Sequence, residues 1–593
     1  MARLAARFRT RTTALVVAGV LAVGVLVALW CGWTAYRVYA DLREAKDQAL
    51  IVKASLERGD DAGAREAGAR FRELTDAAAD RTDGPAWSLA GSLPFLGDDA
   101  RGLAEVADVL ADIAEGGLPP VLDSATRLNA GSYAPAEHQF PLDGIAALQQ
   151  PAAQSSQVFA EASERLAEID ADGFSAPLRQ EYDALRDQVD LAAASLDTAE
   201  RASRLMPKLL GGSGPRDYLL VFQTNAELRA TGGLPGVMSL VHAENGRVDI
   251  TRQASAGAMG ERDRPILPLT DAEMSLYGPQ LGTYFLDANF TPDLPRAADL
   301  WRARWREETG QDIDGVIVVD PVAMSYLLGS TGVITVEGRP LNQLTLVTEV
   351  EHLAYLRYDD QVTQDAFFNG VADAAFDYFA NGGGDPTELV TALVRGVNER
   401  RVGLHLFDDE EQSVLAGTTI AGEVSPEPTS TPQVGVYLND GTGAKMSFFL
   451  DHDVEVTSIS CQGDRQVLRG RLRVTSDTPP DVDQLPPTVT GFEGDGFGDQ
   501  VERGDQLVVA DLFAPVGGVI RDIEFDGEKL PDPAVDRYRG REVVSLGLPL
   551  DPQQTRVVTW TMITGPDQPA PAEVWVTPGA RSENESEVVP SAC

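Results

Sequence analysis

The chain has few of the residues that most enzymes place at their reacting centres. Only five histidines and three cysteines occur among 593 residues. The sequence contains no His-Glu-x-x-His motif, Gly-x-Ser-x-Gly elbow, Ser-x-x-Lys motif or Walker loop. These absences argue against zinc, serine and cysteine hydrolysis, and they leave open only a Ser/His pair assembled by the fold.

Basic residues are also in deficit. Lysine and arginine number 49 against 91 acidic residues, which gives a net charge of −42. Such a surface repels phosphate backbones, and no basic aromatic patch offsets it, so nucleic acid is not expected as a partner. Anionic wall polymers would be repelled too, unless a local basic pocket or a divalent cation intervenes.

One long apolar run stands near the N-terminus. Ala14–Trp33 carries no charged residue and would span roughly 30 Å as a helix. The arginines between Arg3 and Arg11 precede it without an acid, which places the N-terminus in the cytoplasm. The run is too long for the core of a signal peptide, and bulky Trp30, Trp33 and Tyr36 close it. We expect a single-pass, type II anchor in the cell membrane, with the bulk of the chain outside the cytoplasm and the lipid bilayer as a partner.

The cysteines fit this location. Cys31 lies in the expected anchor, whereas Cys461 and Cys593 would lie outside the cytoplasm, where a disulfide persists. A bridge between the latter two would attach the tail to the last domain, and two unpaired thiols are the alternative. Their spacing supports no metal site.

A chain of 593 residues is too long for one core. Apolar residues recur at helical spacing before residue 206, strands and helices alternate in the middle, and short alternating runs follow. We expect a multidomain protein with a basic cytoplasmic tail (1–13), a transmembrane anchor (14–36), a helical stalk or bundle (37–206), a central α/β domain (207–422), a linker (423–433), an antiparallel β-sandwich (434–580) and a polar tail (581–593).

Periodicity also places the main elements. In the α/β region we expect strands at Tyr218–Phe222, Val237–His242, Arg247–Arg252, Val316–Val319 and Ile334–Val336, and helices at Leu294–Thr309, Pro321–Leu328, Leu344–Tyr355 and Thr363–Ala380. In the sandwich we expect strands at Asp453–Ile459, Gln466–Val474, Gln506–Leu512, Val543–Leu548 and Thr555–Met562.

The stretch with the strongest functional signal is Arg216–Gly236. The apolar run Tyr218–Phe222 ends in a polar cluster, QTNAELR, and a glycine pair, Gly232-Gly233. Polar groups just past a buried strand are where α/β folds usually place their sites. A strand followed by a solvated turn is the alternative.

Four blocks resemble a known family. They are YLLVFQTNAELRATGG, DANFTPDLPRAADLW, DGVIVVDPVAMSYLLGSTGVITVEG and LNDGTGAKMSFFL, in that order between Leu89 and Leu450. Together they resemble domain-of-unknown-function family 4012, which consists of uncharacterised membrane-anchored bacterial proteins. The resemblance implies a location in the cell envelope and no particular chemistry.

The second half of the α/β region also resembles LytR-CpsA-Psr proteins. The third block, followed by LNQ at Leu341 and LAYLRYDDQ from Leu353, carries this resemblance. Those proteins transfer glycopolymers from a polyprenyl-pyrophosphate carrier to the cell wall, with arginines on the pyrophosphate and aspartates on Mg²⁺. The resemblance implies a Mg²⁺-dependent, phosphotransferase-like activity on polyprenyl-linked glycans or cell-wall polymers.

Such a transfer requires guanidinium groups for the diphosphate and carboxylates for Mg²⁺. The candidate residues are Arg229 and Glu227 for catalysis; Asn225, Arg357, Asn289 and, less directly, Arg252 for ligand binding; and Asp287, Asp293 and Asp320 for the metal.

Several departures favour a second hypothesis, a non-catalytic scaffold that binds glycan or protein in the envelope. The LytR-CpsA-Psr pattern is richer in arginine, and this chain has Thr363-Gln364 where that pattern carries arginines. Asp320 stands before a proline and is open to the simpler role of helix cap. Arg357 is open to pairing with Asp359 or Asp360 at the surface.

Overall fold

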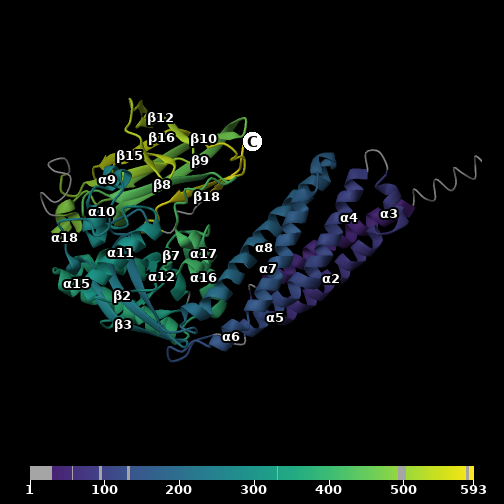
Figure 1. Cartoon of the computed structure of the whole chain (residues 1–593), viewed down its shortest axis with the longest axis horizontal. Coiled ribbons are helices and arrows are strands. Elements are labelled where there is room, and N and C mark those ends of the chain that lie inside the picture. The colour runs from purple at the N-terminus through teal and green to yellow at the C-terminus, as the bar shows by residue number, and fades with distance from the viewer. Residues whose placement is uncertain are drawn as a thin grey trace, which may run out of the picture. The chain divides into compact units, whose positions relative to one another are not determined.

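The computed structural model describes residues 30–56, 58–92, 97–129, 134–329, 331–491, 502–581 and 587–593. The chain forms two compact units. The helical unit comprises Met1–Tyr133 and Pro141–Pro207, and the sheet unit comprises Ala134–Phe140 and Lys208–Cys593. Figure 1 shows long helices in the first unit and mixed helices and strands in the second.

The helical unit begins with a helix over residues 30–56. The next helix starts after Asp60, whose carboxylate accepts a hydrogen bond from the N–H of Gly63 at 3.0 Å, as an aspartate cap does. The helices that follow are α2 (Asp61–Thr82), α3 (Pro85–Ala90), α4 (Gly97–Asp112), the π-helical turn η1 (Ile113–Gly117), α5 (Leu118–Asn129), α6 (Leu142–Ala146), α7 (Gln149–Glu168) and α8 (Ala176–Leu209).

One apolar cluster holds these helices together. Phe71, Val109, Ile113, Leu166 and Tyr182 are buried in it, because each helix turns its apolar stripe inward. The expected helical N-terminal region is confirmed.

The segment between α2 and α4 is rich in glycine and proline. It contains α3, where Trp87 is buried and donates its indole N–H to the carbonyl of Ala100 at 2.7 Å.

Among the described residues, no helix is both long and apolar enough to cross a membrane. The expected anchor, 14–36, falls mostly before residue 30 and therefore outside them. The anchor stays a prediction.

The sheet unit contains a central sheet of five strands in the order β3-β2-β1-β4-β7. Only β1 and β4 are parallel; the other neighbours pair antiparallel. The strands are β1 (Arg216–Thr224), β2 (Leu234–Glu244), β3 (Arg247–Ser255), β4 (Gly315–Val319) and β7 (Val402–Leu406).

Helices cover both faces of this central sheet. Leu219 and Val221 of β1 pack in one cluster with α11 (Leu294–Thr309), while Leu220 and Phe222 face α12 (Pro321–Leu328) and α15 (Gln361–Ala380). The α/β prediction is thereby confirmed. The other helices here are α9 (Asp271–Tyr277), α10 (Gln280–Thr283), α13 (Leu346–Thr348), the π-helical turn η5 (Glu349–Leu353), α14 (Ala354–Arg357), α16 (Pro386–Asn398) and α17 (Asp409–Leu415).

The expected strand at Ile334–Val336 exists but does not belong to the central sheet. It forms a separate hairpin, in which β5 (Val333–Val336) pairs with β6 (Arg339–Asn342). Glu337 and Gly338 have φ values of 50° and 77°, the backbone that a two-residue hairpin turn requires. The place beside β4 is taken by β7, which the pattern did not reveal.

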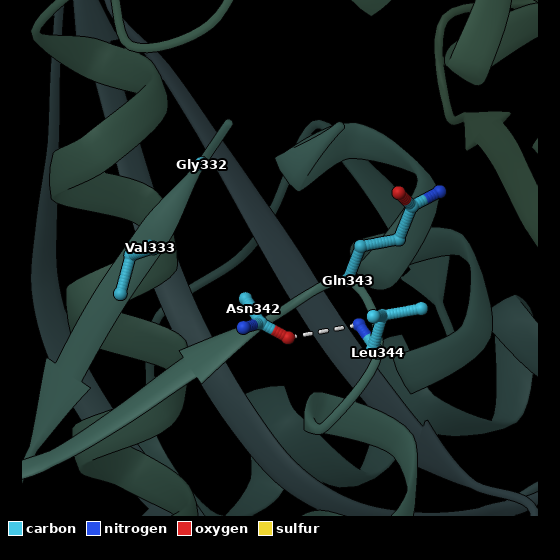
Figure 2. Close-up of a pocket in the computed structure, with 5 residues that line it drawn as sticks. All are labelled: Gly332, Val333, Asn342, Gln343 and Leu344. Carbon is cyan, nitrogen blue, oxygen red and sulfur yellow. Dashed lines mark hydrogen bonds between the residues drawn. The ribbon is translucent and has the colours of Figure 1, made fainter. Parts of the chain in front are cut away.

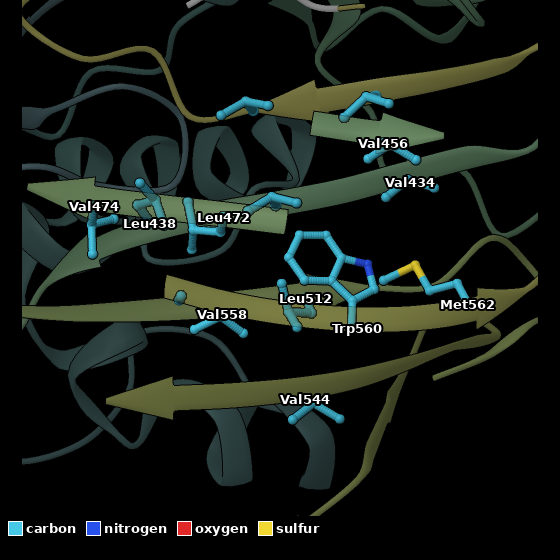
Figure 3. Close-up of a cluster of buried hydrophobic side chains, with 14 of the residues drawn as sticks. Val434, Leu438, Val456, Leu472, Val474, Leu512, Val544, Val558, Trp560 and Met562 are labelled. Carbon is cyan, nitrogen blue, oxygen red and sulfur yellow. The ribbon is translucent and has the colours of Figure 1, made fainter. Parts of the chain in front are cut away.

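The C-terminal part is a sandwich of two sheets, with strand orders β13-β12-β16-β10-β9 and β14-β15-β11-β8-β17-β18. Figure 3 shows Trp560 between the sheets, among Leu472, Leu512 and Met562. The strands are β8 (Gln433–Asp440), β9 (Leu450–Gln462), β10 (Arg465–Ser476), β11 (Gln506–Phe513), β12 (Val519–Phe525), β13 (Glu528–Lys529), β14 (Asp536–Tyr538), β15 (Arg541–Leu550), β16 (Thr555–Ile563), β17 (Ala572–Val576) and β18 (Glu587–Val589).

The second sheet differs from the expected antiparallel sandwich, because β17 runs parallel to β8 and the sheet is mixed. The polar tail contributes β18, which pairs with β17. Of the two alternatives for Cys461 and Cys593, the structure has the disulfide, which joins Cys593 to Cys461 at the end of β9. The tail therefore ties the edges of both sheets together.

The central sheet and the sandwich belong to one compact unit. The expected linker, Glu423–Gln433, is fastened near its ends: Val424 and Pro432 are buried, and the N–H of Val424 donates to the carboxylate of Asp293 at 3.0 Å. Residues 426–430 between them are exposed.

Candidate functional site

The polar residues after β1 form the turn to β2, and this β1–β2 turn (Asn225–Gly233) is buried against the sandwich. Leu228 belongs to the sandwich core. Its carbonyl accepts the N–H of Asp440 at 2.9 Å, and the carbonyl of Ala226 accepts the N–H of Ser447 at 2.9 Å. The turn is thus hydrogen-bonded to the sandwich as if it were part of it.

Arg229 and Glu227 form the centre of an ion-pair cluster. Nη2 of Arg229 lies 2.7 Å from Oε1 of Glu227 and 2.9 Å from Oδ1 of Asp287. The other oxygen of Glu227 accepts a hydrogen bond from Nζ of Lys445, in the sandwich. The guanidinium also lies over the ring of Phe290, 4.7 Å from its centroid. The two predicted catalytic residues therefore meet one predicted metal ligand, in a cluster with little exposed surface.

The electrostatics of this cluster favour fixed charges. Burial disfavours ionised Glu227, but Lys445 and Arg229 outweigh it and lower the pKa of Glu227 to about 2. Burial raises the pKa of Asp287, against the attraction of Arg229. Burial together with the charge of Glu227 raises the pKa of the nearby Asp440 to about 6. Glu227 is thus a permanent anion held by two cations, a structural arrangement more than that of an acid or base working near neutral pH.

The amide nitrogens of the two predicted ligand-binding asparagines are bonded within the fold. Nδ2 of Asn225 lies 3.3 Å from the carbonyls of Gly232 and Pro578. Nδ2 of Asn289 donates to Oγ1 of Thr231 at 2.8 Å and to the carbonyl of Gly233 at 2.9 Å. Both amides hold the β1–β2 turn in its conformation.

The three predicted metal ligands do not come together. Asp287 pairs with Arg229, Asp293 lies 2.8 Å from Arg539, and Asp320 lies 2.8 Å from Arg401. Asp320 also accepts the N–H of Ala323 at 2.7 Å and so caps α12, the simpler role left open by the sequence. Among the residues that the structure describes, no group of three or more His, Cys, Asp or Glu side chains is placed to hold a metal ion.

The remaining arginines lie elsewhere. Arg357 pairs with Glu349 in η5, and not with Asp359 or Asp360. Arg252 lies over the ring of Trp305, 6.0 Å from its centroid. Neither is placed in the Arg229 cluster.

Sequence reasoning missed several buried partners. Glu351 accepts hydrogen bonds from Oγ1 of Thr224 at 2.8 Å and from the N–H of Ala226, and burial raises the pKa of Glu351 to about 8. Lys445 could have been predicted as a partner, because it lies in LNDGTGAKMSFFL, one of the blocks that resemble the family. Glu351 gave none, because a glutamate within a helical pattern is normally exposed.

Away from this cluster, the described part of the chain has two hollows of note. One of about 290 Å³ is lined by Gly332, Val333, Asn342, Gln343 and Leu344 (Figure 2). No charged side chain lines it, and Oδ1 of Asn342 is used by the N–H of Leu344 at 3.0 Å. The other, in the helical unit, has about 330 Å³ and is lined by Val109, Asp112, Glu115, Gly116, Val158, Glu161, Ala162 and Arg165. Neither contains a predicted site residue.

Comparison with known proteins identifies the central region only by family. Residues 213–355 match the family described as Protein of unknown function (DUF4012), so the chain carries a region of this family. The matched region contains β1, the β1–β2 turn and β4. Comparisons with curated proteins and with solved structures give no match. The resemblance to LytR-CpsA-Psr proteins stays a prediction.

Proposed function

We propose that this chain is a non-catalytic binding protein of the bacterial cell envelope, anchored in the membrane by residues 14–36. In this view the α/β part carries the sandwich and holds it in place, and the sandwich presents the binding surface.

The burial of the β1–β2 turn is the observation that carries this proposal. A diphosphate must reach the guanidinium that binds it and displace the partners of that guanidinium. Arg229, however, is buried and already pairs with two carboxylates. Asn225 and Asn289 are likewise bonded to backbone carbonyls. The polar residues of the turn are therefore best explained as the joint between the central sheet and the sandwich.

The start of the first described helix supports the membrane anchor. Trp30, Trp33 and Tyr36 are 52%, 61% and 63% exposed. Exposed aromatic side chains at the end of an apolar segment are typical of a helix that leaves a bilayer, because indole and phenol rings favour the interface. The disulfide between Cys461 and Cys593 fits an extracytoplasmic location, where such bonds persist.

A titration separates binding protein from enzyme. The full-length chain, purified in detergent micelles, would be titrated with a polyprenyl pyrophosphate, with and without Mg²⁺, and assayed for release of the pyrophosphate-linked group. We expect no Mg²⁺-dependent binding and no turnover. Binding that requires Mg²⁺, and that Arg229→Ala abolishes while the protein stays folded, would overturn the proposal.

The alternative is the LytR-CpsA-Psr-like transferase. It is favoured by one observation, the convergence of Arg229 and Glu227 from the β1–β2 turn with Asp287 from the segment before α11. For these groups to act, the turn would have to leave the sandwich and break its hydrogen bonds to Asp440 and Ser447. The same titration tests this, since a turn that opens would bind diphosphate slowly and in a Mg²⁺-dependent way.

A further inference from the structure

Arg400 is an arginine whose charge the described part of the chain leaves without a carboxylate. It follows α16 and lies over the ring of Trp575 on β17, 3.7 Å from the centroid. Within the residues that the structure describes, its guanidinium forms no ion pair and no hydrogen bond, and its Nη1 is buried. A buried charged donor without an acceptor is costly, so this group requires an explanation.

Arg302 is a matched case with the opposite outcome. It lies over the ring of Phe407, 4.2 Å from the centroid, and its Nε and Nη2 bind the two oxygens of Asp312 at 2.7 and 2.8 Å. Bonding to Asp312 raises the pKa of Arg302, whereas burial lowers the pKa of Arg400. Stacking on a ring does not use the N–H groups, which all lie in the plane of the guanidinium. Arg302 spends them on a carboxylate of its own chain, and those of Arg400 remain available.

The backbone of Arg400 has a conformation that glycine would take more easily. The N–H of Arg401 donates to the carbonyl of Gly396 at 2.8 Å, and the N–H of Arg400 donates to the carbonyl of Val397 at 2.9 Å. These two bonds form a Schellman end to α16, in which Arg400, with a φ of 60°, holds the position that glycine usually fills. The chain therefore accepts strain here and places a guanidinium over Trp575.

The surroundings of Arg400 carry an excess of positive charge. In the ladder between β17 and β8, Trp575 lies opposite Gly435, and the ring of Tyr437 packs over that glycine. Arg541 is buried too, and among the described residues its guanidinium donates to carbonyl and amide oxygens and to no carboxylate. Burial raises the pKa of Tyr437, and the charges of Arg400 and Arg541 oppose that rise. Two cations thus act on one phenol, in a chain whose net charge is −42.

Glu573 limits the charge that this place can accept. It lies on β17, two residues before Trp575, and is partly exposed. Burial lowers the pKa of Arg400, and the charge of Glu573 opposes this from beyond ion-pair distance. Glu573 would repel a dianion beside Arg400, whereas a monoanion neutralises the guanidinium.

We propose that Arg400 binds the carboxylate of a partner molecule. A carboxylate is planar, carries one charge and accepts two parallel hydrogen bonds from a guanidinium, as Asp312 does from Arg302. Because Arg400 is only partly buried, a carboxylate reaches it from solvent without unfolding the joint. This site goes beyond the role proposed above and does not depend on it, since a carboxylate can bind whether or not the chain is an enzyme.

The test is a calorimetric titration of the full-length chain in detergent micelles with sodium acetate, which replaces chloride at constant ionic strength. We expect a dissociation constant of about 1 mM, and binding of phosphate at least tenfold weaker. Arg400→Gly suits the backbone, so this variant stays folded, and it should weaken acetate binding at least tenfold. Glucuronate and N-acetylalanine, titrated in parallel, carry the carboxylate on a sugar and on a peptide end, and one of them should bind more tightly than acetate.

Arg302→Met is the matched control, because it removes a stacked arginine whose charge Asp312 already compensates. It should change the affinity less than twofold, and Glu573→Gln should raise the affinity about threefold by removing a repelling charge. No binding by the wild type, equal losses for Arg302→Met and Arg400→Gly, or equal binding of phosphate would overturn the site. Acetate binding by Glu573→Gln alone would overturn it too, because Glu573 would then neutralise Arg400 in the wild type. Acetate binding tighter than that of both larger ligands would leave an adventitious ion only.

Discussion

Arg229 and Arg471 each stand between two carboxylates, and their surroundings give them different roles. Arg229 lies between Glu227 and Asp287 in a buried joint, whereas Arg471 lies between Glu455 and Asp453 on an open sheet face. The sequence around Arg229 looks like a site, and the sequence around Arg471 looks like an ordinary strand. Burial decides what such a group can do: a buried cluster fixes two parts of the fold, whereas an exposed ion pair is screened by solvent and contributes little to stability.

The largest expected effect is on stability, from Arg229→Ala. The substitution leaves Glu227 and Asp287 without their shared cation in a buried setting, which should cost about 3–5 kcal/mol in the free energy of unfolding. Arg471→Ala, the matched control, should cost at most about 1 kcal/mol because its partners are solvated. Urea unfolding of both variants measures this. Similar losses of unfolding free energy in the two variants would contradict the distinction between the buried and the exposed arginine.

Opening the tail disulfide should have the next largest effect. Cys461 and Cys593 are 132 residues apart in sequence. Cys593→Ser should lower the free energy of unfolding by about 2–4 kcal/mol, since a closed loop of this length restricts the unfolded chain. Reductant should lower the wild type to the level of the variant and leave the variant unchanged. A wild type insensitive to reductant would show that the tail does not tie the sheets.

The stability of the protein should also depend on pH through Glu351, which is buried against the β1–β2 turn. Because its pKa is raised to about 8, above the ordinary value near 4.3, its contribution to stability is full below about pH 4 and is lost as the pH rises to 8. The free energy of unfolding of Glu351→Gln should therefore rise relative to that of the wild type by about 1 kcal/mol per pH unit between pH 5 and 8. Urea unfolding of Glu351→Gln and the wild type at three pH values measures this difference, and parallel curves for the two proteins would contradict it.

Much of the fold followed from periodicity. Leu294–Thr309 and Pro321–Leu328 appear with the expected bounds, because a proline in the first turn and apolar residues at helical spacing mark both helices. The strand β7 was missed, since its five residues follow a helix and a charged turn without a turn motif of their own. The strand at Ile334–Val336 was expected, but its pairing in a separate hairpin was not, because strand pattern alone does not say which neighbour a strand takes.

The candidate site was only partly readable. The charged turn after Phe222 was found, and Arg229, Glu227 and Asp287 do meet. The partners that bury them, such as Lys445 and Asp440, come from the sandwich. Lys445 is more than 200 residues away from Glu227 in the sequence. Whether a charged turn faces solvent or a second sheet depends on such distant packing, which spacing within one stretch does not reveal.

The central claim, that the β1–β2 turn is a closed joint, is tested most directly by amide hydrogen exchange of residues 225–233 in the full-length chain. The measurement would be made with and without a polyprenyl pyrophosphate and Mg²⁺. The account predicts exchange as slow as that of the buried strand β11, and unchanged by the ligand. Fast exchange that slows when the diphosphate and Mg²⁺ are added would contradict it, because it would show an accessible turn that binds the ligand.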